Sequence, residues 1–129
     1  MSHVVWLERV PLELLHLEGV ADHGGLPGLR DEGLLESALG RPLNMHHYEQ
    51  VDDIPMLAAC YGVALAKNHP FMDGNKRAAF IGMVVFAELN GLRIVADQVE
   101  ATEVMLAVAS GEMDMEQLAQ WLRAQIRTT

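Results

Sequence analysis

The stretch that decides the fold reads His69-Pro70-Phe71-Met72-Asp73-Gly74-Asn75-Lys76-Arg77. It places a histidine, a carboxylate, a glycine, an amide and two cations within nine residues. The most apolar run of the chain, residues 78–87, follows immediately. Polar groups at this density, set directly before an apolar helix, indicate a functional site on a buried element rather than a solvated surface loop.

Residue types predict the backbone around this stretch. Pro70 has no N–H to donate and disfavours helical geometry in the residue before it, so a preceding helix should end near Asn68. Asp73 is expected to cap a second helix, which should cover about residues 75–89 and stop at Asn90-Gly91. The polar stretch is therefore predicted to be a turn between two helices.

The start of this second helix is predicted to bind an anion. Its first turn has backbone N–H groups without helical partners and the positive end of the helix dipole. Gly74 lets the backbone approach a ligand closely, and Lys76 and Arg77 add two full positive charges. A phosphate or carboxylate is the ligand that these groups favour.

The nine-residue stretch resembles the signature of Fic-domain proteins, H-P-F-x-[DE]-G-N-x-R. The lysine after the asparagine is similar to the Doc, or "death-on-curing", branch of these proteins. The resemblance covers most of the chain and implies the all-α Fic fold, with the signature loop between two buried central helices. It also extends upstream to residues 24–31, residues 34–38, Arg41-Pro42 and residues 65–68.

Length and composition predict one domain over residues 1–129, half of them apolar and enough for a real core. The net charge of −9 argues against direct nucleic-acid binding, which needs a basic surface. The single cysteine, Cys60, fits a reducing compartment. We see no signal-peptide pattern, and the apolar runs at residues 56–66 and 78–87 are too short to span a bilayer. We therefore expect a cytoplasmic protein without membrane contact.

Apolar periodicity and capping residues predict an all-α bundle of about six helices. The third and fourth are apolar on nearly every side and should form the buried centre. Asp97 with Glu100, and Asp114 with Gln117, resemble capping boxes. The expected helices cover residues 12–22, 31–39, 53–68, 75–89, 97–109 and 114–127.

Two further expectations concern the first half of the chain. Gly40-Arg41-Pro42 should end the second helix, and the polar, aperiodic residues 43–53 should form a surface loop. This loop resembles the flap region of Fic proteins and is expected to help dock a protein substrate. A metal site at His46-His47 is disfavoured, because adjacent histidines seldom share an ion. The side chains expected on the buried side of the first helix are Leu12, Leu15, Leu17 and Val20.

His69 and Asp73 are the candidates for the chemistry. Histidine changes charge near neutral pH, so His69 is the candidate base that takes a proton from an attacking hydroxyl. A lone histidine at a helix end is more often simply hydrogen-bonded in place. Asp73 is the candidate Mg²⁺ ligand, because Mg²⁺ prefers carboxylate and phosphate oxygens and keeps several waters. A plain helix cap is the alternative for Asp73.

The neighbouring residues are candidates for nucleotide binding. Gly74 and Asn75 should approach the phosphates, with turn chemistry as their alternative. Lys76 and Arg77 should hold phosphate oxygens, with a solvated helix end as theirs. Phe71 is expected to be a packing anchor that fixes the loop.

The resemblance implies ATP as the substrate and Mg²⁺ as the metal. Most Fic proteins move AMP onto a hydroxyl and carry the longer motif H-x-F-x-[DE]-G-N-G-R-x-x-R. This chain has Lys76 in place of the second glycine and Phe80 in place of the second arginine. Doc-type proteins share these departures, which implies transfer of the γ-phosphate to a threonine of elongation factor Tu and arrest of translation. AMP transfer is the alternative.

The resemblance also implies a partner that restrains the activity. The inhibitory pattern [ST]-x-x-x-E-[GN] is missing from this chain: Glu18-Gly19 supplies its final pair, but Leu14 stands where serine or threonine is required. A separate Phd-like antitoxin, whose tail folds on binding, is therefore expected. A second alternative is an inactive binding module of a toxin–antitoxin complex.

Overall fold

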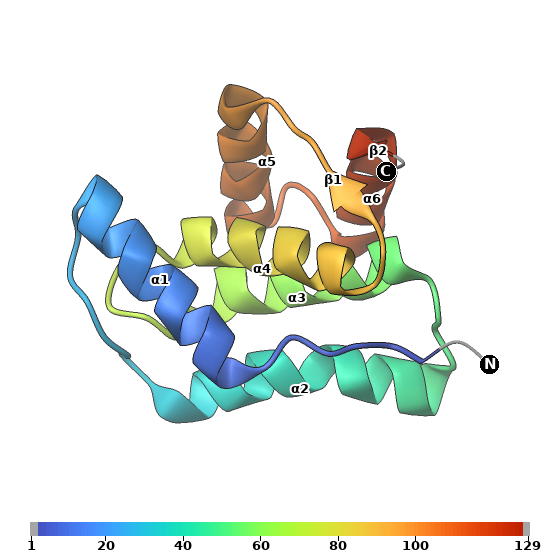
Figure 1. The fold of residues 1–129 in the computed structure, drawn as a ribbon, viewed down its shortest axis with the longest axis horizontal. Helices are drawn as coiled ribbons and strands as arrows, with labels where there is room; N and C mark the ends of the chain where they lie inside the picture. The colour runs from blue at the N-terminus through green and yellow to red at the C-terminus, as the bar shows by residue number, and fades with distance from the viewer. Residues whose placement is uncertain (1–2, 128–129) are drawn as a thin grey trace.

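The structure is a computed structural model that describes residues 3–127. Figure 1 shows α3 and α4 side by side in the middle, with α1 and α2 on one side of them and α5 and α6 on the other. The predicted all-α bundle is confirmed. Its elements are α1 (Arg9–His23), α2 (Glu32–Glu49), α3 (Ile54–Asn68), α4 (Asn75–Leu89), β1 (Arg93–Ile94), α5 (Gln98–Ser110), α6 (Met115–Gln125) and β2 (Ile126–Arg127).

The central helices are buried because their sequences are apolar on all sides. On α3 almost every side chain from Leu57 to Ala66 is buried, and α4 contributes Met83 and Phe86 to the same core. Gly62 lies where α3 meets Met83 and Leu118, so the small residue allows close approach of the helices. Close packing of this kind makes α3 and α4 a rigid support for the turn between them.

The second helix is longer than predicted. It continues through Gly40-Arg41-Pro42 to Glu49, so residues 43–49 are helical and the expected loop shrinks to residues 50–53. Pro42 lacks one helical N–H, but its ring is fully buried. It belongs to an apolar stripe with spacings of three and four residues, and packing of this stripe outweighs the local preference to stop. The stripe consists of Leu35, Ala38, Leu39, Pro42 and Met45.

The first helix begins three residues earlier than predicted, at Arg9, and its buried face differs. The residues that face the core are Leu12, His16 and Val20, each one turn after the last. Leu17, expected to be buried, is 51% exposed, and Leu15 is only partly buried. The buried stripe of α1 therefore includes His16 in place of the expected Leu15 and Leu17.

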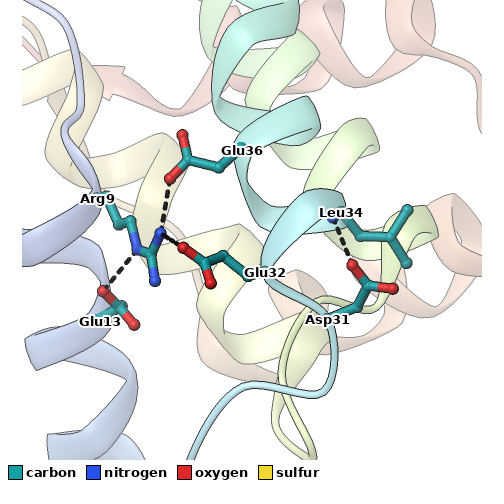
Figure 2. Close-up of polar contacts among 6 residues, drawn as sticks. All are labelled: Arg9, Glu13, Asp31, Glu32, Leu34 and Glu36. Atoms are coloured by element: carbon teal, nitrogen blue, oxygen red, sulfur yellow. Dashed lines mark hydrogen bonds and ion pairs between the residues drawn. The ribbon is translucent and has the colours of Figure 1, made fainter.

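Arg9 joins the starts of α1 and α2 (Figure 2). Its guanidinium donates to Glu13 at 3.0 Å and to Glu32 and Glu36 at 2.8 Å each. Hydrogen bonds to these carboxylates raise the pKa of Arg9 above its usual range. Asp31 caps α2 by accepting the Leu34 N–H at 2.9 Å, as Figure 2 also shows. The start of α2 is thus both capped and tied to the start of α1.

The last helices close the core from the other side. The capping box of α6 is confirmed, with Asp114 and Gln117 bonded reciprocally. Asp97 caps α5 as predicted, but the Glu100 carboxylate accepts the Trp121 Nε1–H at 2.6 Å instead of completing a box. Helix α6 ends at Gln125, before the predicted residue 127, because β2 pairs with β1 in an antiparallel ladder.

Candidate functional site

The residues 69–74, here called the polar loop, connect α3 to α4. Helix α3 ends at Asn68 and α4 begins at Asn75, both as predicted. His69 has φ 50° and ψ 55°, in the left-handed region that non-glycine residues seldom adopt. Gly74 is also left-handed, with φ 72°, and is the residue that precedes α4. Two left-handed residues therefore give the chain its sharp return between the helices.

A segment before α2 lies along the polar loop as a short antiparallel partner. Leu29 pairs with Phe71, the Met72 N–H donates to the Gly28 carbonyl at 3.0 Å, and the Arg30 N–H donates to the Pro70 carbonyl at 2.7 Å. Residues 43–53 were expected to form a flap-like surface loop, and this is wrong for residues 43–49, which belong to α2. The strand-like segment beside the polar loop is residues 28–30. The expected role of residues 43–53 in docking a protein substrate stays a prediction.

Arg30 also reaches the end of α3 with its side chain. Its Nε donates to the His69 carbonyl at 2.7 Å and its Nη2 donates to the Asn68 carbonyl at 2.9 Å. These carbonyls belong to the end of α3, where helical partners run out. Arg30 thus acts as a cap for α3 and holds the backbone of the candidate base.

The inside of the polar loop is held by Phe71 and Asn75. The Phe71 ring is 2% exposed. The Asn75 Oδ1 accepts the Phe71 N–H at 2.9 Å, and the Asn75 Nδ2 donates to the Phe71 carbonyl at 3.0 Å. The Asn75 side chain therefore performs turn chemistry, and any contact of this residue with a phosphate would come from its backbone N–H.

Asp73 does not cap α4 in the way predicted. Its Oδ1 accepts the N–H of Gly74, the residue directly after it, at 2.8 Å, and α4 has no side-chain cap at its N-terminus. The Oδ2 atom lies against Gly25: a Cβ atom on that glycine would be 2.9 Å away. Asp73 is exposed, and Oδ2 accepts no hydrogen bond within residues 3–127. This available oxygen beside the start of α4 fits a site where one carboxylate, phosphate oxygens and water would hold Mg²⁺.

Sequence reasoning missed His16, which belongs to this site. The imidazole is 6% exposed and stacks on the Phe71 ring, with 3.8 Å between centroids and 10° between planes. Its Nε2–H donates to the Asp73 carbonyl at 2.7 Å. The only signal in the sequence was a polar residue within the apolar stripe of α1, between Leu12 and Val20.

The two cations lie on exposed surface at the start of α4. Within the described part of the chain, neither Lys76 nor Arg77 forms an ion pair. Arg77 lines a cavity of about 140 Å³ between α1 and α4, together with Gly74 and His16. His69, Asp73 and Lys76 are outside its lining. The structure therefore brings Gly74 and Arg77 to one cavity, while the side chains of His69 and Asp73 are exposed outside it.

Residues 3–127 hold no group of three or more His, Cys, Asp or Glu side chains arranged to bind a metal. The His46 Nδ1 instead lies 2.9 Å from the Val51 carbonyl and 3.1 Å from an Asp52 carboxylate oxygen. No helix in this range is long and apolar enough to cross a membrane.

Comparisons with known proteins agree on one family. The model of the Fic/DOC family matches residues 6–87, which include α1, the segment before α2, the polar loop and most of α4. The "Protein kinase doc" of Escherichia phage P1 is 35% identical over 109 residues, which cover 84% of this chain and 86% of that protein. The "Toxin Doc" of Mycolicibacterium smegmatis is 38% identical over 101 residues, which cover 74% of this chain and 76% of that protein.

Proposed function

The chain belongs to the Fic/DOC family, and we propose that it is a Doc-like toxin that moves the γ-phosphoryl group of ATP to a hydroxyl of a target protein. The observation that carries this proposal is the polar loop itself. It sets a histidine, a carboxylate and the positively charged start of α4 on a backbone held by contacts from α1, the segment before α2, and α4. A site so constrained suits transfer chemistry, which depends on positioning and electrostatic stabilisation.

In this proposal His69 is the general base. Its side chain is exposed, so a hydroxyl of another protein has access to it. The hydroxyl oxygen forms a bond to the γ-phosphorus, and its proton passes to the His69 imidazole. The bond between that phosphorus and the β,γ-bridging oxygen breaks, and ADP leaves. Assistance by a base of this kind is typically worth about 10²–10⁴-fold in rate.

The phosphates would rest on the start of α4. The backbone N–H of Asn75, the helix dipole and the side chains of Lys76 and Arg77 all favour negative charge there, while the Gly74 N–H is bonded to the Asp73 carboxylate. Asp73 would hold Mg²⁺ through its available oxygen. When bound, the metal would supply charge neutralisation between phosphate oxygens. The chain's own residues would bind ATP and orient its phosphates.

The environment of position 80 supports γ-phosphoryl transfer over AMP transfer. The Phe80 ring is half-buried and packs toward α6, with its centroid 6.5 Å from that of Trp121. The residue that replaces the second arginine of the longer Fic motif therefore serves packing and offers no clamp for a phosphate. Lys76, in place of the second glycine, adds a side chain where backbone alone would meet phosphate. Both features oppose the nucleotide pose that presents the α-phosphate.

Labelled ATP tests the proposal directly. The protein is incubated with a cell lysate and ATP labelled in either the γ or the α position, and labelled proteins are identified by mass spectrometry. We expect label from the γ position and an added phosphate on the target. Label from the α position and an added AMP would establish the adenylyltransferase alternative. A matched reaction with His69→Asn should give neither product.

We further propose elongation factor Tu as the target, arrest of translation as the result, the cytoplasm as the location and a Phd-like antitoxin as the restraining partner. The names of the relatives, a kinase and a toxin, support this class of activity. Expression of the chain alone should stop growth, and His69→Asn should remove toxicity while it keeps antitoxin binding. Toxicity that survives this substitution would favour the second alternative, a binding module without catalysis.

A further inference from the structure

The buried side chains of His16 and Asn75 both bond to the backbone of the polar loop. Burial of a polar side chain is costly unless its hydrogen-bonding groups find partners. His16 occupies a position in the buried stripe of α1 that a leucine could fill, and its Nε2–H donates to the Asp73 carbonyl. Because a carbonyl only accepts, the proton of this bond lies on Nε2.

The bond from His16 acts on a single peptide group. The carbonyl of Asp73 and the N–H of Gly74 are two ends of the same planar unit. His16 holds the carbonyl end at 2.7 Å, and the N–H end donates to the Asp73 Oδ1 at 2.8 Å. Since the unit is rigid, the direction of its carbonyl fixes the direction of the N–H that holds the carboxylate.

Other contacts surround this peptide group. The imidazole is held parallel to the Phe71 ring, whose own N–H and carbonyl are bonded to Asn75. The chain at Gly25 also passes close to the carboxylate, since a Cβ atom on that glycine would lie 2.9 Å from the Asp73 Oδ2. With the imidazole in place, the Gly74 N–H that holds the Asp73 Oδ1 has a defined direction.

We propose that His16 is a positioning residue for Asp73: through the peptide group between Asp73 and Gly74 it sets the direction of the carboxylate that would hold Mg²⁺. This inference rests on the proposed function, because it takes Asp73 as the metal ligand. It assigns to α1, more than fifty residues away in sequence, control over the metal requirement of the site. Groups that orient metal ligands in this way typically alter metal affinity or activity by about 10–100-fold.

Two substitutions separate the hydrogen bond from the ring stacking. His16→Phe keeps a flat ring against Phe71 and removes the donor. His16→Gln keeps an N–H donor near the position of Nε2 and removes the ring. His47→Phe, at an exposed histidine in the last turn of α2, is the matched control. Each variant is first compared with the parent by thermal unfolding.

The measurement is ATP binding by calorimetry, with Mg²⁺ titrated and with EDTA as the metal-free condition. For His16→Phe we expect the Mg²⁺ concentration that half-saturates tight ATP binding to rise about 10–100-fold, with metal-free ATP binding unchanged. His16→Gln should stay close to the parent, and His47→Phe should match it. This readout does not depend on transfer to a protein target.

Several results would overturn the inference. An unchanged Mg²⁺ requirement in folded His16→Phe would do so and would leave the proposed function standing. An equal loss of ATP binding with and without Mg²⁺, or equal defects in the Phe and Gln variants, would reduce His16 to a structural residue. Absence of Mg²⁺-dependent ATP binding in the parent would instead remove the proposed function, and this inference with it.

A measurement on the parent alone covers the case in which the variants do not fold. Nitrogen-15 NMR of the imidazoles should show His16 protonated on Nε2. Its Nε2–H resonance and the Gly74 amide should both shift when Mg²⁺ is added to the ATP-bound protein, because the peptide group joins them to the Asp73 carboxylate. A metal-induced shift at neither group would overturn the proposal.

Discussion

The Arg30 guanidinium donates to the main-chain carbonyl of His69 at 2.7 Å and so holds the backbone of the candidate base. A second bond, to the Asn68 carbonyl at 2.9 Å, fixes the same end of α3. His69 has a left-handed backbone, a conformation that costs a non-glycine residue about 1 kcal/mol or more. Arg30 offsets this cost from outside the polar loop.

Loss of the Arg30 side chain should therefore weaken both stability and activity. We expect Arg30→Ala to lower the free energy of unfolding by about 1 kcal/mol, measured by urea denaturation, because two exposed hydrogen bonds to carbonyls are removed. Arg127→Ala is the matched control, since Arg127 also donates to nearby carbonyls, those of Ala124 and Ile126. Transfer activity should fall in Arg30→Ala only. Equal activity loss in both variants would contradict a specific role for Arg30.

Substitution of His69 should separate chemistry from backbone strain. His69→Asn should lower transfer by about 10²–10⁴-fold with little change in stability, because asparagine tolerates the left-handed region better than most residues. His69→Val should lose the same activity and also about 1–3 kcal/mol of stability, because a β-branched residue is strained there. Kinetics and urea denaturation check the two effects. Full activity in His69→Asn would exclude His69 as the base.

Two glycines in helices should respond oppositely to alanine. At Gly62 an added Cβ would collide with the Met83 side chain and crowd Leu118, so Gly62→Ala should destabilise the fold by about 1–3 kcal/mol. At Gly40, in α2, an added Cβ meets no atom of the described residues within 4 Å. Gly40→Ala should therefore stabilise by about 0.5–1 kcal/mol through helix propensity. Chemical denaturation of both variants tests this contrast, and a stable Gly62→Ala would refute the close α3–α4 packing.

Tyr61 should make stability depend on pH in alkaline solution. Burial raises the pKa of Tyr61 well above its usual range, and the Leu7 N–H that its hydroxyl accepts opposes the shift more weakly. A tyrosine in the unfolded chain ionises near pH 10. Above about pH 10 the unfolded state therefore loses this proton first, and the free energy of unfolding should fall as pH rises further.

Variants of the two tyrosines test that dependence by urea denaturation between pH 8 and the alkaline limit. Tyr61→Phe should be less stable near neutral pH by about 1–3 kcal/mol, because the buried Leu7 N–H loses its acceptor. Its stability should then decline less steeply above about pH 10 than that of the parent. Tyr48→Phe, at an exposed position, should retain the parent's slope. An unchanged slope in Tyr61→Phe would contradict the assignment.

The parts of the fold that the sequence predicted are those with local signals. Pro70 and the long apolar runs predict where α3 and α4 begin and end. Asp31 and Asp114 predict the starts of α2 and α6. The predicted end of α2 was wrong because the burial of Pro42 depends on packing against other helices, which the neighbouring residues in the sequence do not reveal.

The same distinction explains what was missed at the site. The residues of the nine-residue motif are contiguous, so their chemistry could be recognised directly. His16 and Arg30 bond to backbone carbonyls that lie 57 and 39 residues further along the chain. A backbone carbonyl has no side-chain identity, so the sequence carries no complementary residue that would mark such a pair.

The positions of these anchors also bear on how the protein is made. His16, Gly28, Arg30 and Asn75 all precede α5 and α6, and chains are synthesised from the N-terminus. Once α4 has left the ribosome, all the residues named above as holding the polar loop have therefore been synthesised. At that moment α3 still lacks Leu118 and the rest of α6 along one side. The nascent chain thus holds the residues that support the polar loop before the helix that closes one side of its core has been made.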